Sequence, residues 1–371
     1  MRCRGPGTDP ETIAGKLNGR MDKHPTMTEH ALDRRLSVAP MMAWTDRHCR
    51  YLHRLAAPNA LLFTEMVTSG ALLNGPAERL LAFDASEHPV AIQLGGSDPD
   101  DLARAATLAV EAGFDEVNLN VGCPSPRVKQ GRFGASLMRE PELVAACVRA
   151  MAAAVDVPVT VKCRLGVDDD DSEAFLRRFV ETVADGGCRT FYVHARKALL
   201  NGLSPAENRT VPPLRYERAY AVKQWLPELE VIVNGGIREV GELKEHLAAV
   251  DGVMIGRAAY QSPVVLGEMD RFVYGDARGG SESRSGDRSH SGGVDSYVIM
   301  AGYRAYMARE LEAGTRLQDM TRHALGLFAG LPGARRFRRI LSDAQRLKAG
   351  DLAVVDEALA ALGDPDRQRA A

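Results

Sequence analysis

Residues 116–125 combine the pattern of a buried strand with side chains that can do chemistry. The first half alternates apolar residues with the amides Asn118 and Asn120, and the second half presents Cys123 directly before Pro124. Proline fixes its own φ and restricts the residue before it, so the thiol is held in a rigid turn. A thiol beside two amides suits a ligand contact, although a free cysteine is more often a small buried hydrophobic residue.

Three further polar side chains stand in or at the ends of apolar segments. Lys162 lies within Val-Thr-Val-Lys-Cys-Arg, where a lysine is costly to bury without an anionic partner. Either a carboxylate such as Glu65 satisfies it, or it stabilises negative charge on a ligand such as a reduced flavin ring. His194 and Gln93 are either structural residues or ligand contacts, and their place at strand ends favours ligand contacts.

Two glycine turns close the series of apolar segments. They are Asn234-Gly235-Gly236 and Gly256-Arg257. Turns after the seventh and eighth strands of a barrel commonly bind phosphate through backbone N–H groups. The alternative is a pair of tight turns that simply need glycine. Together, at these two places, the turns favour a phosphorylated cofactor.

The segments that must position these residues number eight. They are residues 36–40, 60–65, 90–94, 116–121, 159–163, 190–195, 230–235 and 252–256. Helix-like stretches separate most of them, several with Pro or Ser at or near their start, which predicts an α/β fold of the (β/α)8 TIM-barrel type. A doubly wound open sheet is the rival. It usually offers fewer strands and a GxGxxG loop after the first one, and the first segment here ends Val-Ala-Pro-Met-Met.

Composition excludes several classes of protein. Lys plus Arg is 47 and Asp plus Glu is 49, so net charge identifies no partner. Six cysteines are scattered without a CxxC pair or a metal-like spacing with His, which predicts a reduced, cytoplasmic protein without a metal site. No apolar run approaches the roughly 20 residues of a membrane span.

The chain divides into five parts by composition. We expect a disordered N-terminal extension (1–33), the barrel (34–276), a Gly/Ser/Arg-rich flexible linker (277–293), an all-α helical domain (294–350) and a C-terminal tail (351–371). The helical domain is basic, and Arg335, Arg336, Arg338 and Arg339 cluster around Phe337. Such a run is usually a solvated helix face, and the alternative is a grip on RNA.

Several blocks of the sequence closely resemble the tRNA-dihydrouridine synthases. They are residues 37–50, 118–125, 131–134, 161–166, 193–197 and 234–237, and residues 202–209, 321–328 and 332–335 resemble the A branch of that family. The resemblance runs in order from about residue 36 to about residue 342. It implies FMN at the mouth of a (β/α)8 barrel, NADPH as reductant, and reduction of uridines 20 and 20a in the D-loop of tRNA.

The resemblance also assigns roles to residues of this chain. Flavin contacts are implied for Pro40, Met41, Met42, Gln93, Lys162 and His194. Contacts around the phosphate are implied for Asn234, Gly235, Gly236, Gly256 and Arg257. RNA contacts are implied for Asn120, Asn208 and Arg209, and less strongly for Arg335 and Arg338. Cys123 matches the proton donor: hydride from reduced FMN would reach uracil C6, and a thiol with an ordinary pKa of about 8.5 is protonated at neutral pH and can protonate C5.

Two other functions compete with this one. The first is a barrel flavoprotein that reduces or oxidises a free pyrimidine, as dihydroorotate dehydrogenases do; a basic helical domain argues against it. The second is a non-catalytic RNA-binding relative, against which the intact Cys123, Lys162 and His194 argue. Ala43, Cys163 and Ser136 depart from the family pattern, and we interpret them as tuning rather than loss of activity. No obligate protein partner is implied.

Overall fold

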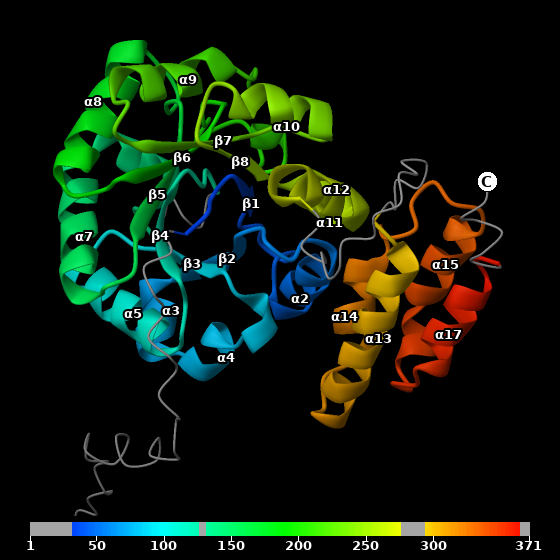
Figure 1. The fold of residues 1–371 in the computed structure, drawn as a ribbon. Helices are drawn as coiled ribbons and strands as arrows, with labels where there is room; N and C mark the ends of the chain where they lie inside the picture. Colours follow the sequence, from blue (N-terminus) through cyan, green and yellow to red (C-terminus); the bar gives the residue numbers. More distant parts are fainter. Residues whose placement is uncertain (1–31, 126–130, 276–293, 364–371) are drawn as a thin grey trace, which may run out of the picture. The chain divides into compact units, whose positions relative to one another are not determined.

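Eight parallel strands form the central sheet of the computed structural model, which describes residues 32–125, 131–275 and 294–363 (Figure 1). Almost all of the predicted N-terminal extension and the whole predicted linker lie outside these residues. The strands are Leu36–Val38 (β1), Leu62–Thr68 (β2), Val90–Gly95 (β3), Glu116–Val121 (β4), Val159–Arg164 (β5), Thr190–His194 (β6), Glu230–Asn234 (β7) and Gly252–Ile255 (β8).

The sheet closes on itself. Neighbouring strands pair in parallel in the order β1-β8-β7-β6-β5-β4-β3-β2. Ser37 of β1 also bridges Leu61 next to β2, and the Val38 amide donates to the Leu61 carbonyl at 2.9 Å. This is a (β/α)8 barrel, which confirms the predicted fold, and each predicted segment overlaps one strand, although β2 runs three residues beyond its segment to Thr68.

Helices connect the strands and cover the outside of the sheet (Figure 1). They are Arg47–Ala56 (α2), Ser69–Asn74 (α3), Ala77–Leu81 (α4), Pro99–Glu111 (α5), Pro141–Ala154 (α7), Glu173–Asp185 (α8), Tyr216–Trp225 (α9), Val240–Leu247 (α10), Arg257–Gln261 (α11) and Pro263–Tyr274 (α12). Local sequence sets their ends. The Asp98 side chain caps α5 ahead of Pro99, and Ser172 caps α8, which stops before Gly187 at a φ of 107°.

Alternation along β4 explains the two amides that looked out of place in an apolar strand. Successive side chains of a strand point to opposite faces, so Glu116, Asn118 and Asn120 share the face inside the barrel. Glu116 lies fully buried at the start of the strand, where it accepts hydrogen bonds from Arg34 at 2.7 Å and Thr160 at 2.6 Å. This polar layer fills the lower end of the barrel and leaves the upper end for other chemistry.

A second group of helices follows the barrel. It comprises Ser296–Glu312 (α13), Leu317–Ala324 (α14), Ala334–Leu341 (α15), Ala344–Leu347 (α16) and Ala353–Ala360 (α17). We call it the helical region. Its hydrophobic core includes Met300, Met320 and Phe337, and Leu52 of α2 belongs to the same cluster. Within the described residues, no helix has the length and apolar character needed to cross a membrane.

The C-terminal boundary of the helical region needs one correction. We expected a tail from residue 351, but α17 forms there and packs on α15. Val355 and Ala358 of α17 are completely buried in the core of the helical region. Burial of this apolar face explains why the segment folds, and the described helical region therefore reaches residue 363.

Candidate active site

A cavity of about 1020 Å³ opens at the carboxyl ends of the barrel strands. Fourteen of the sequence-predicted site residues line it: Pro40, Met41, Met42, Gln93, Asn120, Cys123, Lys162, His194, Arg209, Asn234, Gly235, Gly236, Gly256 and Arg257. They come from seven strand ends and one loop, and only the closed barrel brings them together. The volume is large enough for a small organic ligand or cofactor.

The turn that carries Cys123 is shaped by the side chain of Asn120. The Asn120 side-chain carbonyl accepts hydrogen bonds from the Cys123 amide at 2.9 Å and the Gly122 amide at 3.2 Å. Its NH₂ group donates to the Gln93 side-chain carbonyl at 2.7 Å, and Gln93 in turn donates to Asn118 at 2.8 Å. This chain of amides extends from the polar layer below and fixes the position of the thiol.

Lys162 enters the cavity without a carboxylate partner among the residues that the structure describes. Its ammonium donates to the side-chain carbonyl of Asn234 at 3.0 Å. Glu65, which the sequence suggested as a partner, accepts instead from the backbone amide of Ala43. Burial, and after it the nearby Arg164 guanidinium, lower the pKa of Lys162 to about 7. The lysine charge is therefore left for an anionic ligand to stabilise.

His194 is held neutral beside the glycine turn. Burial, and after it the cations Arg164 and Lys162, keep the pKa of His194 well below its usual range. Gly235 packs against the imidazole with a φ of 118°, and a Cβ at that position would lie 2.8 Å from His194 Cδ2. A neutral imidazole can both donate and accept a hydrogen bond at the cavity wall. Glycine at 235 is thus required by close packing as well as by backbone conformation.

Charge in the cavity has one sign. The lining includes the cations Lys162, Arg164, Arg209, Arg238 and Arg257, and no Asp or Glu among the described residues lines it. Burial lowers the pKa of Arg209, with the neighbouring Arg257 as the next cause. Crowded like charges without carboxylates are stabilised by a bound anion, and arginine and lysine both bind phosphate. The donor set therefore fits a phosphorylated ligand.

Comparison with known proteins decides the family. The sequence model of a family described as Dihydrouridine synthase (Dus) matches residues 37–362. The chain belongs to the dihydrouridine synthase family. The matched residues include the whole cavity lining and nearly all of the helical region, so both parts belong to the family pattern.

Several relatives in this family align over most of the chain. The tRNA-dihydrouridine(20/20a) synthase of Vibrio cholerae is 54% identical over 327 residues, which cover 88% of this chain and 96% of the relative. The enzyme of the same name from Xanthomonas axonopodis pv. citri is 52% identical, with 89% and 94% covered. Among solved structures, morphinone reductase matches with a TM-score of 0.47 and 14% identity, over 64% of this chain and 86% of that one, which is too distant to support an argument.

The predicted RNA contact of Asn208 stays a prediction, and the structure places this side chain in the interior of its loop. Asn208 is fully buried, and its amide donates to the Leu199 carbonyl at 2.9 Å while accepting from the Leu199 amide at 2.7 Å. The side chain holds its own loop together and does not line the cavity. The neighbouring Arg209 is exposed and does line it, so the loop presents the arginine and buries the asparagine.

Arg164 has a structural function that the sequence did not reveal. Its Nε donates to the Gly122 carbonyl at 3.1 Å and its Nη1 to the Asn208 carbonyl at 3.0 Å. The guanidinium thus joins the Cys123 turn to the loop that presents Arg209. The spacing in the sequence could have indicated this placement. Arg164 follows Lys162 by two residues on β5, so both side chains point to the same face, inside the barrel.

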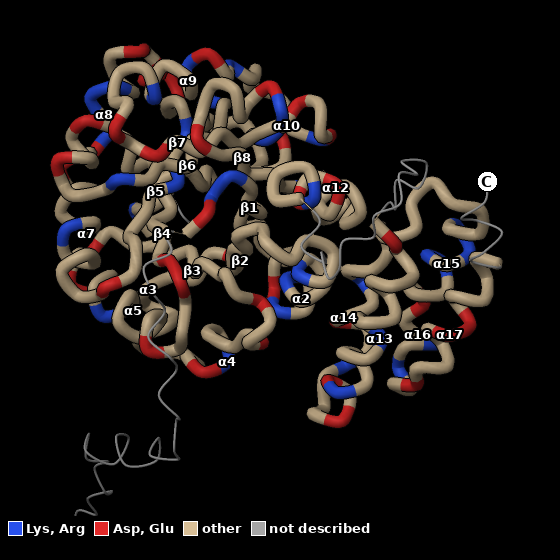
Figure 2. Tube along the Cα trace, in the orientation of Figure 1, with Lys and Arg blue, Asp and Glu red and all other residues tan. Residues whose placement is uncertain are grey.

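Arg335 and Arg338 lie outside the cavity. Both are exposed on α15, where Figure 2 shows the basic positions, and Phe337 between them is buried in the helical core. No ion pair joins either arginine to a carboxylate in the described residues. Their predicted contact with RNA is compatible with this exposure and stays a prediction.

Proposed function

We propose that this chain reduces uridine to 5,6-dihydrouridine in the D-loop of tRNA, at positions 20 and 20a, with bound FMN and with NADPH as reductant, in the cytoplasm. The observation that carries the proposal is the place of Cys123 at the edge of a cavity lined by five cations and no carboxylate in the described residues. Relatives with the tRNA-dihydrouridine(20/20a) synthase name, aligned over most of both chains, support it.

The cavity residues fit FMN. The glycine turns and Arg257 supply N–H groups and positive charge for its phosphate, and Lys162, His194 and Gln93 supply polar groups for its ring system. When bound, FMN would supply the hydride that uracil C6 accepts. Lys162 would stabilise negative charge near the ring, since its pKa of about 7 allows a nearby anion to draw it into the protonated form.

Cys123 would complete the reduction. Addition of hydride at C6 would leave an enolate-like negative charge on the uracil ring, and protonation at C5 would neutralise it. The thiol can donate this proton as a general acid. The two backbone bonds to Asn120 hold the turn, so the sulfur keeps one position relative to the cavity. This fixed placement lowers the entropy cost of bringing acid and base together.

The helical region would supply the grip on tRNA. A uridine must leave its stacked position to enter the cavity, which costs a few kcal/mol. Contacts between phosphates and exposed arginines such as Arg335 and Arg338 would offset that cost. Arg209 at the mouth would contact the RNA close to the extracted base.

The test combines a spectrum with an RNA assay. Purified protein should show flavin absorption that NADPH bleaches, and tRNA from cells lacking the gene should gain dihydrouridine at positions 20 and 20a on incubation with it. Free uridine should not react under the same conditions, which separates this function from a free-pyrimidine reductase. A protein that takes up no FMN, or tRNA that stays unmodified, would contradict the proposal.

A further inference from the structure

The turn between β1 and α2 forms one wall of the cavity. Met41, Met42 and Trp44 line the cavity, and Ala43 between them has a φ of 63°. A residue with a Cβ rarely adopts this left-handed conformation, so surrounding contacts must hold it. Those contacts determine the shape of the wall.

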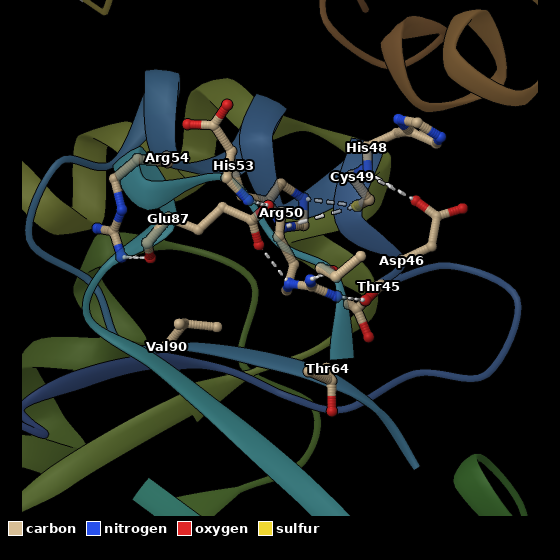
Figure 3. A network of polar contacts seen from close by, with 12 residues as sticks. Thr45, Asp46, His48, Cys49, Arg50, His53, Arg54, Thr64, Glu87 and Val90 are labelled. Carbon is tan, nitrogen blue, oxygen red and sulfur yellow. Dashed lines mark hydrogen bonds and ion pairs between the residues drawn. The ribbon is translucent and has the colours of Figure 1, made fainter. Parts of the chain in front are cut away.

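The barrel holds part of this turn. The Ala43 amide donates to the Glu65 carboxylate of β2, and the Met41 amide donates to the Thr45 hydroxyl at 2.9 Å. Arg50 of α2 donates to the Thr45 carbonyl at 3.0 Å (Figure 3). These bonds fix the two ends of the turn and the nitrogen side of Ala43, and they leave its carbonyl for another partner.

The helical region supplies that partner. Arg322 of α14 donates from Nη1 to the Ala43 carbonyl at 3.1 Å, and its Nη2 binds the Asp46 carboxylate. His323 places its Nε2 3.0 Å from the same carboxylate. Asp46 in turn caps α2 by accepting from the amides of His48 and Cys49 (Figure 3). One carboxylate therefore joins α14, the cavity turn and the first barrel helix.

A second set of contacts links the segment around α14 to Trp44 and to α11, which follows β8. Tyr260 of α11 stacks on Trp44 with ring centroids 4.3 Å apart and meets His323 edge-on at 5.7 Å. Gly326, which follows α14, packs so tightly that a Cβ there would lie 2.1 Å from the carbonyl oxygen of Gln261. Gln261 itself lines the cavity. The segment around α14 thus braces two cavity walls.

We propose that Arg322 is a positioning residue through which the helical region sets the shape of the cofactor cavity. The guanidinium holds the strained Ala43 peptide and the Asp46 cap at once, and Met42 and Trp44 flank that peptide. The inference rests on the proposed function for the identity of the cofactor alone. Arg322 therefore connects the helical region, which is proposed to bind tRNA, to the cavity wall that is proposed to contact FMN.

The test compares Arg322→Ala with a matched control on the same helical region. Arg316 is exposed directly before α14 and pairs with Asp319 of that helix, so Arg316→Ala removes an arginine whose ion pair lies within the helical region. Trp44 and Trp225 are the two tryptophans of the chain, so a Trp225→Phe background makes Trp44 the reporter. Arg322→Ala should increase acrylamide quenching of Trp44 and raise the FMN dissociation constant of the apoprotein roughly tenfold. Arg316→Ala should leave both at the background values.

Two more variants separate positioning from folding. Asp46→Asn keeps an oxygen to cap α2 but loses the charge that binds Arg322, so Trp44 quenching should increase while far-ultraviolet circular dichroism stays unchanged. Arg322→Lys keeps one cation but cannot span both acceptors, so it should recover only part of the FMN affinity. If Arg322→Ala fails to fold, Asp46→Asn decides.

Two results would overturn the inference. One is wild-type Trp44 quenching in both Arg322→Ala and Asp46→Asn. The other is an equal increase in quenching in Arg316→Ala. If the background protein itself binds no FMN, the cofactor assignment of the proposed function fails, and Trp44 quenching still decides whether Arg322 positions the wall.

Discussion

The ammonium of Lys162 on β5 donates to the side-chain carbonyl of Asn234 on β7 at 3.0 Å, across the intervening strand β6. The two residues therefore meet inside the barrel and not along the sheet. A neutral amide cannot compensate a buried positive charge, which is why burial lowers the pKa of Lys162 to about 7. The pair holds the lysine in place and leaves its charge for a ligand.

The first prediction concerns the pH dependence of cofactor binding. An anionic ligand favours the protonated lysine, so above pH 7 binding must take up a proton and the affinity for FMN should fall, by up to about tenfold per pH unit. The same lowered pKa also affects folding. Between about pH 7 and the ordinary lysine pKa, Lys162 binds a proton in the unfolded chain more than in the folded one. The contribution of Lys162 to the free energy of unfolding therefore rises with pH in this range. FMN titrations of the apoprotein between pH 7 and pH 9 measure the slope.

Lys162→Met is the matched control for that slope. Methionine fills a similar volume without a titrating group, so FMN binding should be weaker at pH 7 and nearly independent of pH up to pH 9. His194 does not contribute in this window because its pKa lies well below the usual value. An equal slope in the wild-type and Lys162→Met proteins would show that another group takes up the proton.

The second prediction concerns Cys123. Cys49, Cys147, Cys163 and Cys188 are buried, whereas Cys123 is partly exposed, so it should be the first of these five to react with iodoacetamide. Cys123→Ala should keep bound flavin and its reduction by NADPH but lose dihydrouridine formation by about 10²-fold or more, as expected for removal of a general acid. Mass spectrometry in a Cys3→Ser background and dihydrouridine mapping check the two parts.

Two controls make the Cys123 result specific. Cys188→Ala removes a thiol that is fully buried in the barrel and remote from the cavity lining, so it should leave turnover per folded enzyme unchanged. Alkylation in the presence of FMN and tRNA should slow if Cys123 faces the bound substrate. Full turnover in Cys123→Ala would remove it from the mechanism.

The barrel and most of its site could be predicted from local sequence. Short apolar segments bounded by Gly, Pro and charged residues indicate strands, and closure of a barrel forces the strand ends to one mouth. That single rule places Gln93, Cys123, Lys162 and His194 around one cavity although 101 positions separate the first from the last in number. Period-two alternation also accounts for Asn118 and Asn120, which form the amide chain below the thiol.

Contacts set by distant parts of the chain could not be predicted in this way. Nothing local shows that Arg322 reaches the Ala43 carbonyl, because the residues meet only when α14 packs beside α2. The loop around Asn208 has no period, so the sequence does not indicate which of two adjacent polar residues points inward. The apolar pattern of α17 is present in the sequence, but only its packing on α15 shows that it belongs to the helical region.

The third prediction separates the two adjacent residues of that loop. Asn208→Ala leaves the Leu199 amide and carbonyl without their buried partner, so the free energy of unfolding should fall by about 1–3 kcal/mol. Arg209→Ala removes an exposed side chain at the cavity mouth, so stability should change by less than about 0.5 kcal/mol while the tRNA dissociation constant rises. Urea unfolding and filter binding measure the two effects. If Asn208→Ala instead raised the tRNA dissociation constant and left the free energy of unfolding unchanged, Asn208 would belong to the RNA-binding surface.

The last prediction concerns the grip of the helical region on tRNA. Arg335→Glu with Arg338→Glu reverses two exposed charges on α15 without disturbing the buried Phe337 beside them. Each lost phosphate contact should reduce the steepness of the plot of log binding constant against log salt by roughly 0.7–0.9, so the pair should reduce it by about 1.5 and weaken binding at low salt.

The matched control is Arg149→Glu with Arg189→Glu, an equal charge change at exposed barrel positions that do not line the cavity. Filter binding over a salt series compares the two double variants, while oxidation of NADPH by oxygen should stay normal in both. Equal loss of tRNA affinity in both would show that net charge, and not this face of α15, governs binding.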